Sequence, residues 1–266
     1  MAYEDISYEV QDGVGTLTLN KPDKLNAMSW NTWAEMESVW AEVQNDDATK
    51  AIVITGAGRG FSAGTDLTAS FDEEDQWHER PHPGRSGMMR SRHLGTEQLY
   101  NLQKPTIAAV NGVCVGAGLS LALACDIRVA AEAARFSAIF VKRAINADTG
   151  SSWFLPRLVG AEQAMRMLFT GELVPSEKAL EIGLVSEVVP TEDVLARAQE
   201  LAGEIARGPS VAIEIMKRMV RESDTNTLGR HIELEEYLQG VAHKTDDVQE
   251  GRQSFLEKRE PVFRGR

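Results

Sequence analysis

Two glycine-rich stretches hold the residues whose types and spacing are best suited to chemistry. The first is GAGRGFSAGTDL, residues 56–67, and the second is VGAGL, within residues 104–128. Each follows a short apolar run, at 51–55 and at 106–110, that predicts a buried strand. Glycine lets a ligand approach the backbone closely, and the first amides of a helix have no partner within it. Two such loops side by side can donate two N–H groups to one oxygen, as an oxyanion hole does.

A second interpretation of the first stretch is a serine nucleophile. Gly60-Phe61-Ser62-Ala63-Gly64 matches the nucleophile elbow of serine hydrolases, with Ser62 as the nucleophile. A true elbow leads from a strand directly into a helix, and no clear helical pattern follows here. Gly56-Ala57-Gly58 also lacks the third glycine of a dinucleotide-binding fingerprint. The paired-loop interpretation therefore explains more of the sequence.

The elements expected around these loops alternate between strands and helices. Residues 3–10 and 15–19 predict a hairpin with Asp12-Gly13 in its turn. Ser29 is expected to cap a helix whose buried stripe is Trp33, Met36, Val39, Trp40 and Val43. Further helices are predicted at 92–102, from Gly116 to near Cys125, at 161–170, at 176–182, and over much of the chain after Val194. The polar stretch from Thr68 to Ser91 is either a cover for the site or disordered.

The composition limits the classes of partner. A net charge of -12 argues against nucleic acid and against an anionic membrane surface, because either would need a basic face. Only two cysteines are present, Cys114 and Cys125, both in apolar surroundings, which indicates a reducing compartment. The N-terminal segment MAYEDISYEV carries acid where a signal peptide carries base, so we expect a cytoplasmic protein.

The sequence as a whole resembles the enoyl-CoA hydratase/isomerase (crotonase) superfamily. The similarity lies in FSAGTDL after GAGRG, in KPTIAAVNGVCVGAGLSLALACD, in WFLPRLVG and in FLEKREPVFRGR near the end. It implies an α/β fold, a spiral of ββα units with a helical C-terminal region. Residues 1–193 would form the spiral core with the acyl-CoA site, and residues 194–266 a helical region for packing and oligomerisation. The resemblance implies a homotrimer or a dimer of trimers.

The resemblance also assigns residues to an acyl-CoA thioester. The oxyanion donors would be the amides of Thr65 and of Ala117, the residue between Gly116 and Gly118. Coenzyme A enters as part of the substrate, so no separate cofactor and no metal are implied. The positions that correspond to coenzyme A contacts are Lys24, Ala63, Asp66, Leu67, Gly116 and Lys258, with Arg259 beside the last.

The acid/base group departs from the pattern of hydratases in this superfamily. Hydratases carry two glutamates that position water, and Ser120 and Phe140 occupy those places here. Asp148 instead stands at the position where isomerases and dehalogenases of the superfamily hold a catalytic carboxylate. A structural alternative is that Asp148 caps a helix that starts near Thr149.

The function expected from these residues is a double-bond shift in an enoyl-CoA, with Asp148 as the proton shuttle. Several alternatives remain open. They are a hydratase with non-standard acid/base groups, an aryl-CoA dehalogenase or hydrolase that uses Asp148 and His93, and a non-catalytic acyl-CoA binder.

Overall fold

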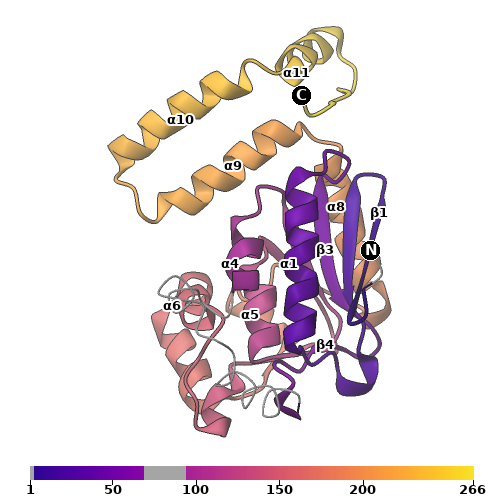
Figure 1. The fold of residues 1–266 in the computed structure, drawn as a ribbon. Helices are drawn as coiled ribbons and strands as arrows, with labels where there is room; N and C mark the ends of the chain where they lie inside the picture. Colours follow the sequence, from indigo (N-terminus) through magenta and orange to yellow (C-terminus); the bar gives the residue numbers. More distant parts are fainter. Residues whose placement is uncertain (1–2, 69–93) are drawn as a thin grey trace, which may run out of the picture.

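The computed structural model describes residues 3–68 and 94–266, and its main sheet forms the centre of the fold (Figure 1). This sheet has the strand order β1-β2-β3-β5-β7-β10. A smaller sheet has the order β4-β6-β8-β9. The strands are β1 Ile6–Gln11, β2 Val14–Leu19, β3 Ala51–Gly56, β4 Gly60–Ser62, β5 Thr106–Val110, β6 Val113–Val115, β7 Ile127–Ala131, β8 Arg135–Ser137, β9 Val174–Pro175 and β10 Glu187–Val189.

Strand pairs repeat along the chain and produce the predicted spiral. In β3–β4, β5–β6 and β7–β8 the first strand joins the large sheet and the second joins the small one. The successive first strands pair in parallel, with Ile52 opposite Thr106 and Ile107 opposite Ile127. The crotonase-type α/β fold expected from the sequence is confirmed.

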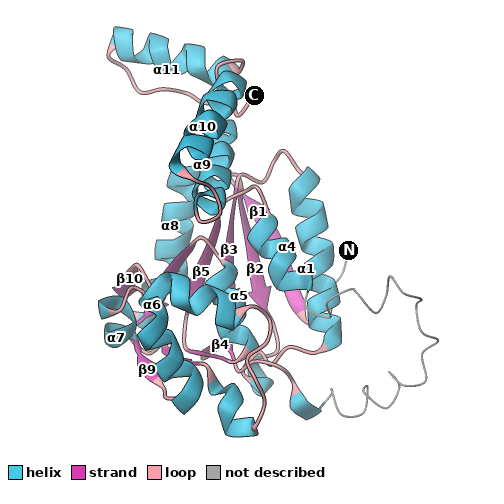
Figure 2. Ribbon diagram, turned by 90° about the vertical axis from the view of Figure 1, so that its left-hand side faces the viewer, coloured by secondary structure: helices cyan, strands magenta, loops and turns pink. Residues whose placement is uncertain are grey.

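Helices cover both faces of the large sheet (Figure 2). Helix α8 lies against β3, β5 and β7 on one side, whereas α1, α4 and α5 lie on the other. The helices are α1 Trp30–Asn45, α4 Leu94–Asn101, α5 Ala117–Ala124, α6 Ser151–Thr170, α7 Ser176–Glu181, α8 Val194–Ala206, α9 Ser210–Ser223, α10 Leu228–Ala242 and α11 Asp246–Glu257, with 3-10 turns η1 Pro22–Lys24, η2 Ile139–Arg143 and η3 Thr191–Asp193.

Local signals in the first third of the chain behave as predicted. Asp12 and Gly13 both have positive φ, 50° and 82°, as a tight hairpin turn between β1 and β2 requires. The Ser29 hydroxyl accepts a hydrogen bond from the Thr32 amide and caps α1. The whole predicted stripe of α1 is buried.

The two cysteines, Cys114 and Cys125, are buried free thiols, so they form no disulfide in the structure.

Two elements differ from the expectation. The sequence predicts a strand at 106–110 and a helix from Gly116, and the structure adds the short strand β6 between them. Helix α6 starts at Ser151, ten residues earlier than periodicity suggested, and bends at Gly160, where φ is 77°. Pro156 and Gly160 within this segment obscure its helical pattern.

The C-terminal helices α9, α10 and α11 project from the end of the sheet opposite the glycine-rich loops (Figure 1). Helix α8 comes just before them and is part of the core, since Val194, Ala198 and Ala202 are buried. Within residues 3–68 and 94–266, no helix combines the length and apolar character needed to cross a membrane.

Candidate active site

The two glycine-rich loops meet at Gly64 and Gly116. Gly64 has φ of 93°, and a Cβ atom built there would lie 2.9 Å from the Val115 carbonyl oxygen and 3.4 Å from the Ala117 nitrogen. A Cβ atom on Gly116 would lie 3.9 Å from the Gly64 Cα atom. The two backbones come this close because neither residue has a side chain. The loops therefore lie side by side, as the sequence suggested.

Each loop presents an amide next to this contact. Ala117 is the first residue of α5, so its N–H has no partner within the helix. Thr65 is held by a bridge in which the Met28 amide donates to the Gly64 carbonyl and the Asp66 amide donates to the Met28 carbonyl. Among the described residues, neither the Thr65 N–H nor the Ala117 N–H donates a backbone hydrogen bond. Both can therefore donate to a ligand oxygen.

Ser62 is a structural residue. It is fully buried, its hydroxyl donates to the Asn26 carbonyl at 2.8 Å, and the Gly64 amide donates to that hydroxyl at 3.2 Å. A Cβ atom on Gly118 would lie 2.6 Å from the Ser62 Cβ atom, so α5 packs directly on this residue. A nucleophile needs an accessible oxygen, and the serine-hydrolase interpretation is therefore wrong.

The loop that contains Lys24 is attached to the first glycine-rich loop. The Asn26 amide group donates to the Ala57 and Gly60 carbonyls and accepts from the Lys21 amide. The Lys24 ammonium lies 2.8 Å from a carboxylate oxygen of Asp66.

The pair of Lys24 and Asp66 puts charge at the edge of the site. The hydrogen bond from Lys24, with a second from Thr68, holds the pKa of Asp66 well below its usual value. Lys24 is half exposed, whereas Asp66 is buried. The ammonium can thus face an anionic ligand while Asp66 fixes its position. Ala63 is half-buried and Leu67 exposed at the same edge.

Asp148 lies in a loop that is attached to α5. Its carbonyl accepts from the Ser151 amide at 3.1 Å, the Ser151 hydroxyl at 3.2 Å and the Ser120 hydroxyl at 3.4 Å. Thr149 and Gly150 both have positive φ, so the chain turns sharply after it. This places Asp148 beside the first turn and a half of α5, the helix that begins with Ala117.

The carboxylate of Asp148 does not cap α6. The N-cap residue is Gly150, and no side chain bonds to the first amides of the helix. The Asp148 carboxylate instead accepts a hydrogen bond from the Thr149 hydroxyl at 3.1 Å, and the residue is half-buried. The capping interpretation is therefore wrong, and the second carboxylate oxygen has no hydrogen bond to the described residues.

Ser120 and Phe140 provide no carboxylate near the loops. Both side chains are buried, and the Ser120 hydroxyl is 3.4 Å from the Gly116 and Asp148 carbonyls, to which it can donate. Ser120 therefore links α5 to the Asp148 loop.

Two predicted residues are not placed at this site. His93 lies outside the described residues. Lys258 follows α11, which lies at the opposite end of the molecule from the glycine-rich loops (Figure 1). Arg259 is paired with Glu250 and Glu257.

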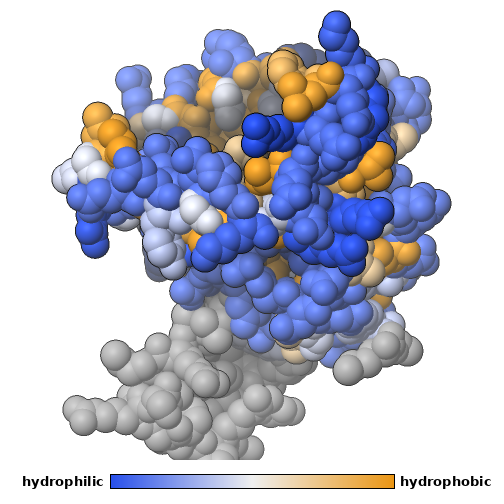
Figure 3. Space-filling model, turned by 90° about the horizontal axis from the view of Figure 1, so that it is seen from above, coloured by the Kyte–Doolittle hydropathy of each residue, from blue (hydrophilic) through white to orange (hydrophobic). Residues whose placement is uncertain are grey.

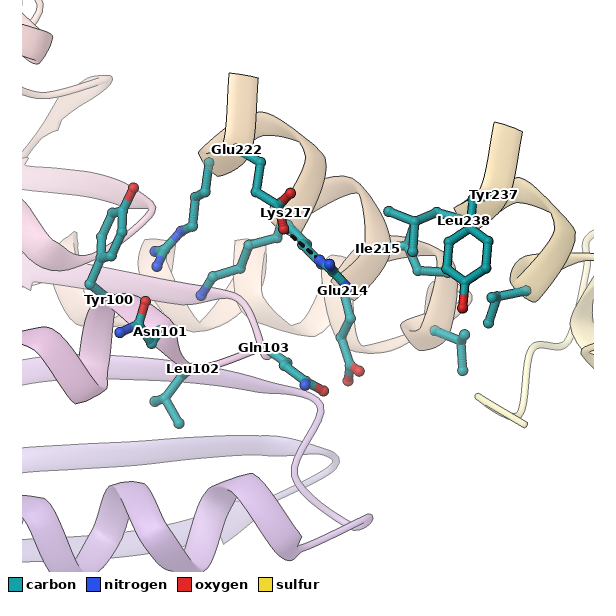
Figure 4. A pocket seen from close by; sticks show the side chains of 14 residues that line it. Tyr100, Asn101, Leu102, Gln103, Glu214, Ile215, Lys217, Glu222, Tyr237 and Leu238 are labelled. Atoms are coloured by element: carbon teal, nitrogen blue, oxygen red, sulfur yellow. Dashed lines mark hydrogen bonds and ion pairs between the residues drawn. The ribbon is translucent and has the colours of Figure 1, made fainter. Parts of the chain in front are cut away.

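Among the hollows in the described part of the chain, two bear on the site. The larger, of about 760 Å³, separates the end of α4 from α9 and α10, with Lys217, Glu222 and Tyr237 around it (Figure 4). It contains none of the predicted site residues. The smaller, of about 470 Å³, lies between α4 and α6 and is lined by Thr149 and Gly150, next to Asp148. Tyr100, Trp153 and Phe154 also line it.

Only part of that smaller hollow was foreseeable. Trp153 stands near Asp148 in the sequence, but Tyr100 comes from a different helix and no local pattern marks it. A short helix with an aromatic residue is usually a packing element, so only the tertiary structure shows that Tyr100 faces α6.

An α/β spiral with paired glycine-rich loops defines a crotonase-like acyl-CoA enzyme, and the comparisons agree. Residues 9–266 match the family model described as Enoyl-CoA hydratase/isomerase, so the chain belongs to this family. It is 38% identical to the 1,2-epoxyphenylacetyl-CoA isomerase of Escherichia coli, with 99% of each chain covered.

Relatives named as hydratases are nearly as similar. The chain is 33% identical to the crotonyl-CoA hydratase of Syntrophomonas wolfei, again over 99% of both chains. The crystal structure of an enoyl-CoA hydratase from Bacillus anthracis superposes with a TM-score of 0.90 at 30% identity, covering 99% of this chain and 100% of the other. The family is therefore established, and both reaction types occur among the relatives.

Proposed function

We propose that this enzyme shifts a double bond in an enoyl-CoA, with Asp148 as the proton shuttle. The observation that carries the proposal is the attachment of the Asp148 loop to α5 through Ser120, beside the paired glycine-rich loops. A carboxylate and two unpaired amides on adjoining segments are the groups that such a reaction needs.

In this mechanism the thioester carbonyl oxygen accepts hydrogen bonds from the Thr65 and Ala117 amides. The Asp148 carboxylate takes a proton from one carbon of the acyl chain, and the electron pair moves through the conjugated system to the carbonyl oxygen, forming an enolate. The protonated Asp148 then returns the proton to a different carbon as the carbonyl re-forms. No atom is gained or lost, and no metal or redox cofactor takes part.

Two observations favour isomerisation over hydration. Buried Ser120 and Phe140 stand where hydratases of the superfamily hold glutamates, so no carboxylate at these positions can activate water. The relative from E. coli, which is the more similar of the two named above, is named as an isomerase, and its named substrate is an epoxide of phenylacetyl-CoA. The acyl-CoA itself brings coenzyme A, whose phosphates the half-exposed Lys24 can meet.

The test is Asp148→Asn, which keeps the shape of the side chain and removes its basicity. We expect the rate of conversion between 2-enoyl- and 3-enoyl-CoA isomers to fall by roughly 10²–10⁴-fold, as for loss of a general acid/base group. Binding of a saturated acyl-CoA should be unchanged. Mass spectrometry distinguishes isomerisation, which leaves the mass constant, from hydration.

Three results would contradict the proposal. A product heavier by one water would indicate a hydratase with another acid/base group. Tight binding without turnover in the wild-type protein would indicate an acyl-CoA binder. Full turnover in Asp148→Asn would remove Asp148 from the mechanism.

The same proposal includes the assembly, a homotrimer or a dimer of trimers in the cytoplasm. Lys258 follows α11, which lies at the end of the molecule opposite the glycine-rich loops (Figure 1). If Lys258 binds coenzyme A, it does so at the site of a neighbouring subunit. The exposed apolar side chains of α9–α11 support such an assembly.

A further inference from the structure

We infer that the groove between α4 and α6 receives the distal part of the acyl group and favours an aromatic ring there over an alkyl chain. This inference rests on the proposed function, since it concerns the substrate of the same site. Thr149 and Gly150, which directly follow Asp148, line the groove. An acyl group whose reacting carbons lie at Asp148 therefore has this hollow beside its far end.

The groove is built around three aromatic rings in mutual contact. The ring centroids of Tyr100 and Trp153 are 5.2 Å apart with an interplanar angle of 78°. Those of Trp153 and Phe154 are 5.0 Å apart at 89°, and those of Tyr100 and Phe154 are 5.5 Å apart at 54°. The two pairs that include Trp153 are edge-to-face, which is one of the arrangements that aromatic rings prefer. Trp153 remains 42% exposed, so the cluster still has aromatic surface for a further ring.

Neighbouring side chains fix these rings before any ligand arrives. The Arg157 guanidinium lies 3.9 Å from the Trp153 ring centroid, and the Arg221 guanidinium lies 3.7 Å from that of Tyr100. Cations stack favourably on aromatic faces. A rigid wall suits a rigid ring, because little conformational freedom is lost on binding.

The charges around the groove favour a neutral acyl group. Arg157 pairs with Asp224 at 3.3 Å and Arg221 pairs with Asp126 at 2.6 Å, so each cation already has a carboxylate partner. Glu97 lines the groove and is exposed. An acyl group that ends in a carboxylate would meet a like charge there.

The volume is also suitable. The hollow measures about 470 Å³, within the range of roughly 300–1,000 Å³ that is usual for small-molecule sites. Thr96 lines it as well.

The test compares the binding of phenylacetyl-CoA with that of butyryl-CoA by isothermal titration calorimetry. We expect wild-type protein to bind phenylacetyl-CoA about tenfold more tightly, which is ~1.4 kcal/mol and in keeping with ring-on-ring contact plus burial. Trp153→Leu should reduce the ratio of phenylacetyl-CoA to butyryl-CoA affinity to near one. The affinity for butyryl-CoA should stay within about twofold of the wild-type value, because its alkyl chain makes no ring-to-ring contact with Trp153. Phe169→Leu, an exposed aromatic on the same helix, is the matched control and should retain the ratio.

A second comparison tests the charge argument. Succinyl-CoA resembles butyryl-CoA but ends in a carboxylate, and it should bind more weakly. Glu97→Gln should reduce the difference in affinity between butyryl-CoA and succinyl-CoA. If this difference in affinity is unchanged in the variant, Glu97 does not exclude anionic acyl groups.

Equal affinities of the wild-type protein for phenylacetyl-CoA and butyryl-CoA would overturn the inference, as would identical behaviour of Trp153→Leu and Phe169→Leu. Failure of the proposed function gives a separate result. Turnover that persists in Asp148→Asn would refute the proton shuttle and leave the ring preference intact. A loss of turnover in Asp148→Asn without any ring preference would refute only the present inference.

Discussion

Gly64 and Gly116 determine the site through the side chains that they lack. The Val115 carbonyl oxygen lies 2.9 Å, and the Ala117 nitrogen 3.4 Å, from the position that a Cβ atom on Gly64 would take, so both contacts would be too tight. Any side chain at Gly64 would push the first loop away from α5. The Thr65 and Ala117 amides would then no longer converge on one oxygen. The alignment of these two donors therefore requires glycine at position 64, where the side chain is only a hydrogen atom.

Gly64→Ala should reduce both turnover and stability, whereas replacement of a glycine that only has positive φ should affect stability alone. We expect kcat to fall by roughly 10²-fold, which is typical for loss of one oxyanion donor, and stability to fall by about 1–3 kcal/mol from the positive φ. Gly160→Ala is the matched control, because Gly160 also has positive φ, 77°, but no atom lies within 4 Å of its Cβ position. Steady-state kinetics and thermal melts separate the two effects. Equal kcat values in the two variants would show that the contact between the loops does not matter.

Helix α9 is joined to the core by a buried ionic cluster centred on Asp126. The Asp126 carboxylate lies 2.7 Å from the Lys217 ammonium and 2.6 Å from the Arg221 guanidinium, and it accepts hydrogen bonds from Thr106. Burial alone would raise the pKa of Asp126, but the two cations outweigh it and hold that pKa below the usual value. Burial lowers the pKa of Lys217 to about 8, against the opposing effect of Asp126.

Asp126→Asn should loosen this attachment. It leaves the Lys217 and Arg221 side chains, which are 8% and 15% exposed, without their carboxylate partner. Breaking a fully buried ion pair typically costs about 3–5 kcal/mol, and we expect a loss at the lower end of that range, measurable by urea unfolding at pH 7. The pKa of Lys217 should fall further once the carboxylate charge is gone. Between this lowered pKa and 10.5, the ordinary pKa of a lysine, the unfolded state binds more protons at position 217 than the folded state does. The free energy of unfolding should therefore rise with pH across that range.

The double variant Asp126→Asn with Lys217→Met is the control for that pH effect. Without an ammonium at position 217, the rise in the free energy of unfolding between pH 7 and pH 9 should disappear. If the single and double variants showed the same pH profile, another group would be responsible. A stability equal to that of the wild type in Asp126→Asn would mean that the cluster does not fasten α9.

Sequence reasoning succeeded where the signal was local and failed where it was tertiary. Ser29, Asp12-Gly13 and the glycine-rich loops are defined within a few residues, and the structure confirms the helix cap, the hairpin turn and the close approach of the two loops. Strand β6 has only three residues, too few for a periodic pattern. The groove combines Tyr100 with Trp153, which are far apart in the chain, so no window of sequence contains both.

The whole molecule has an uneven distribution of apolar surface. The projecting helices α9–α11 expose large apolar side chains, among them Val220, Leu228, Tyr237, Phe255 and Leu256. Figure 3, viewed from this end, shows apolar groups between the charged ones. Exposed apolar residues that gather on one part of a protein usually mark an interface. Helices α9–α11, called the arm below, make few contacts with the rest of the chain beyond those of α9, and this supports the proposed assembly with further copies of the chain.

Assembly should therefore depend on the arm. We expect the wild-type protein to show the mass of a trimer or hexamer in light scattering coupled to size-exclusion chromatography. Leu228→Glu combined with Tyr237→Glu, at side chains that are 77% and 70% exposed in the single chain, should shift the protein to the monomer mass. The added charges would have to be buried unpaired in the interface, which is strongly unfavourable.

Val10→Glu is the control, because Val10 is an exposed apolar residue that belongs to strand β1 and not to helices α9–α11. It should keep the wild-type mass. A monomeric wild-type protein would contradict the proposed assembly, and a double variant that retained the full mass would place the interface elsewhere. If the subunits separate but isomerisation persists at saturating substrate, each subunit carries a complete set of reacting groups. A rise in KM alone would then indicate that the arm of a neighbour, with Lys258, contributes to coenzyme A binding and not to the proton transfer.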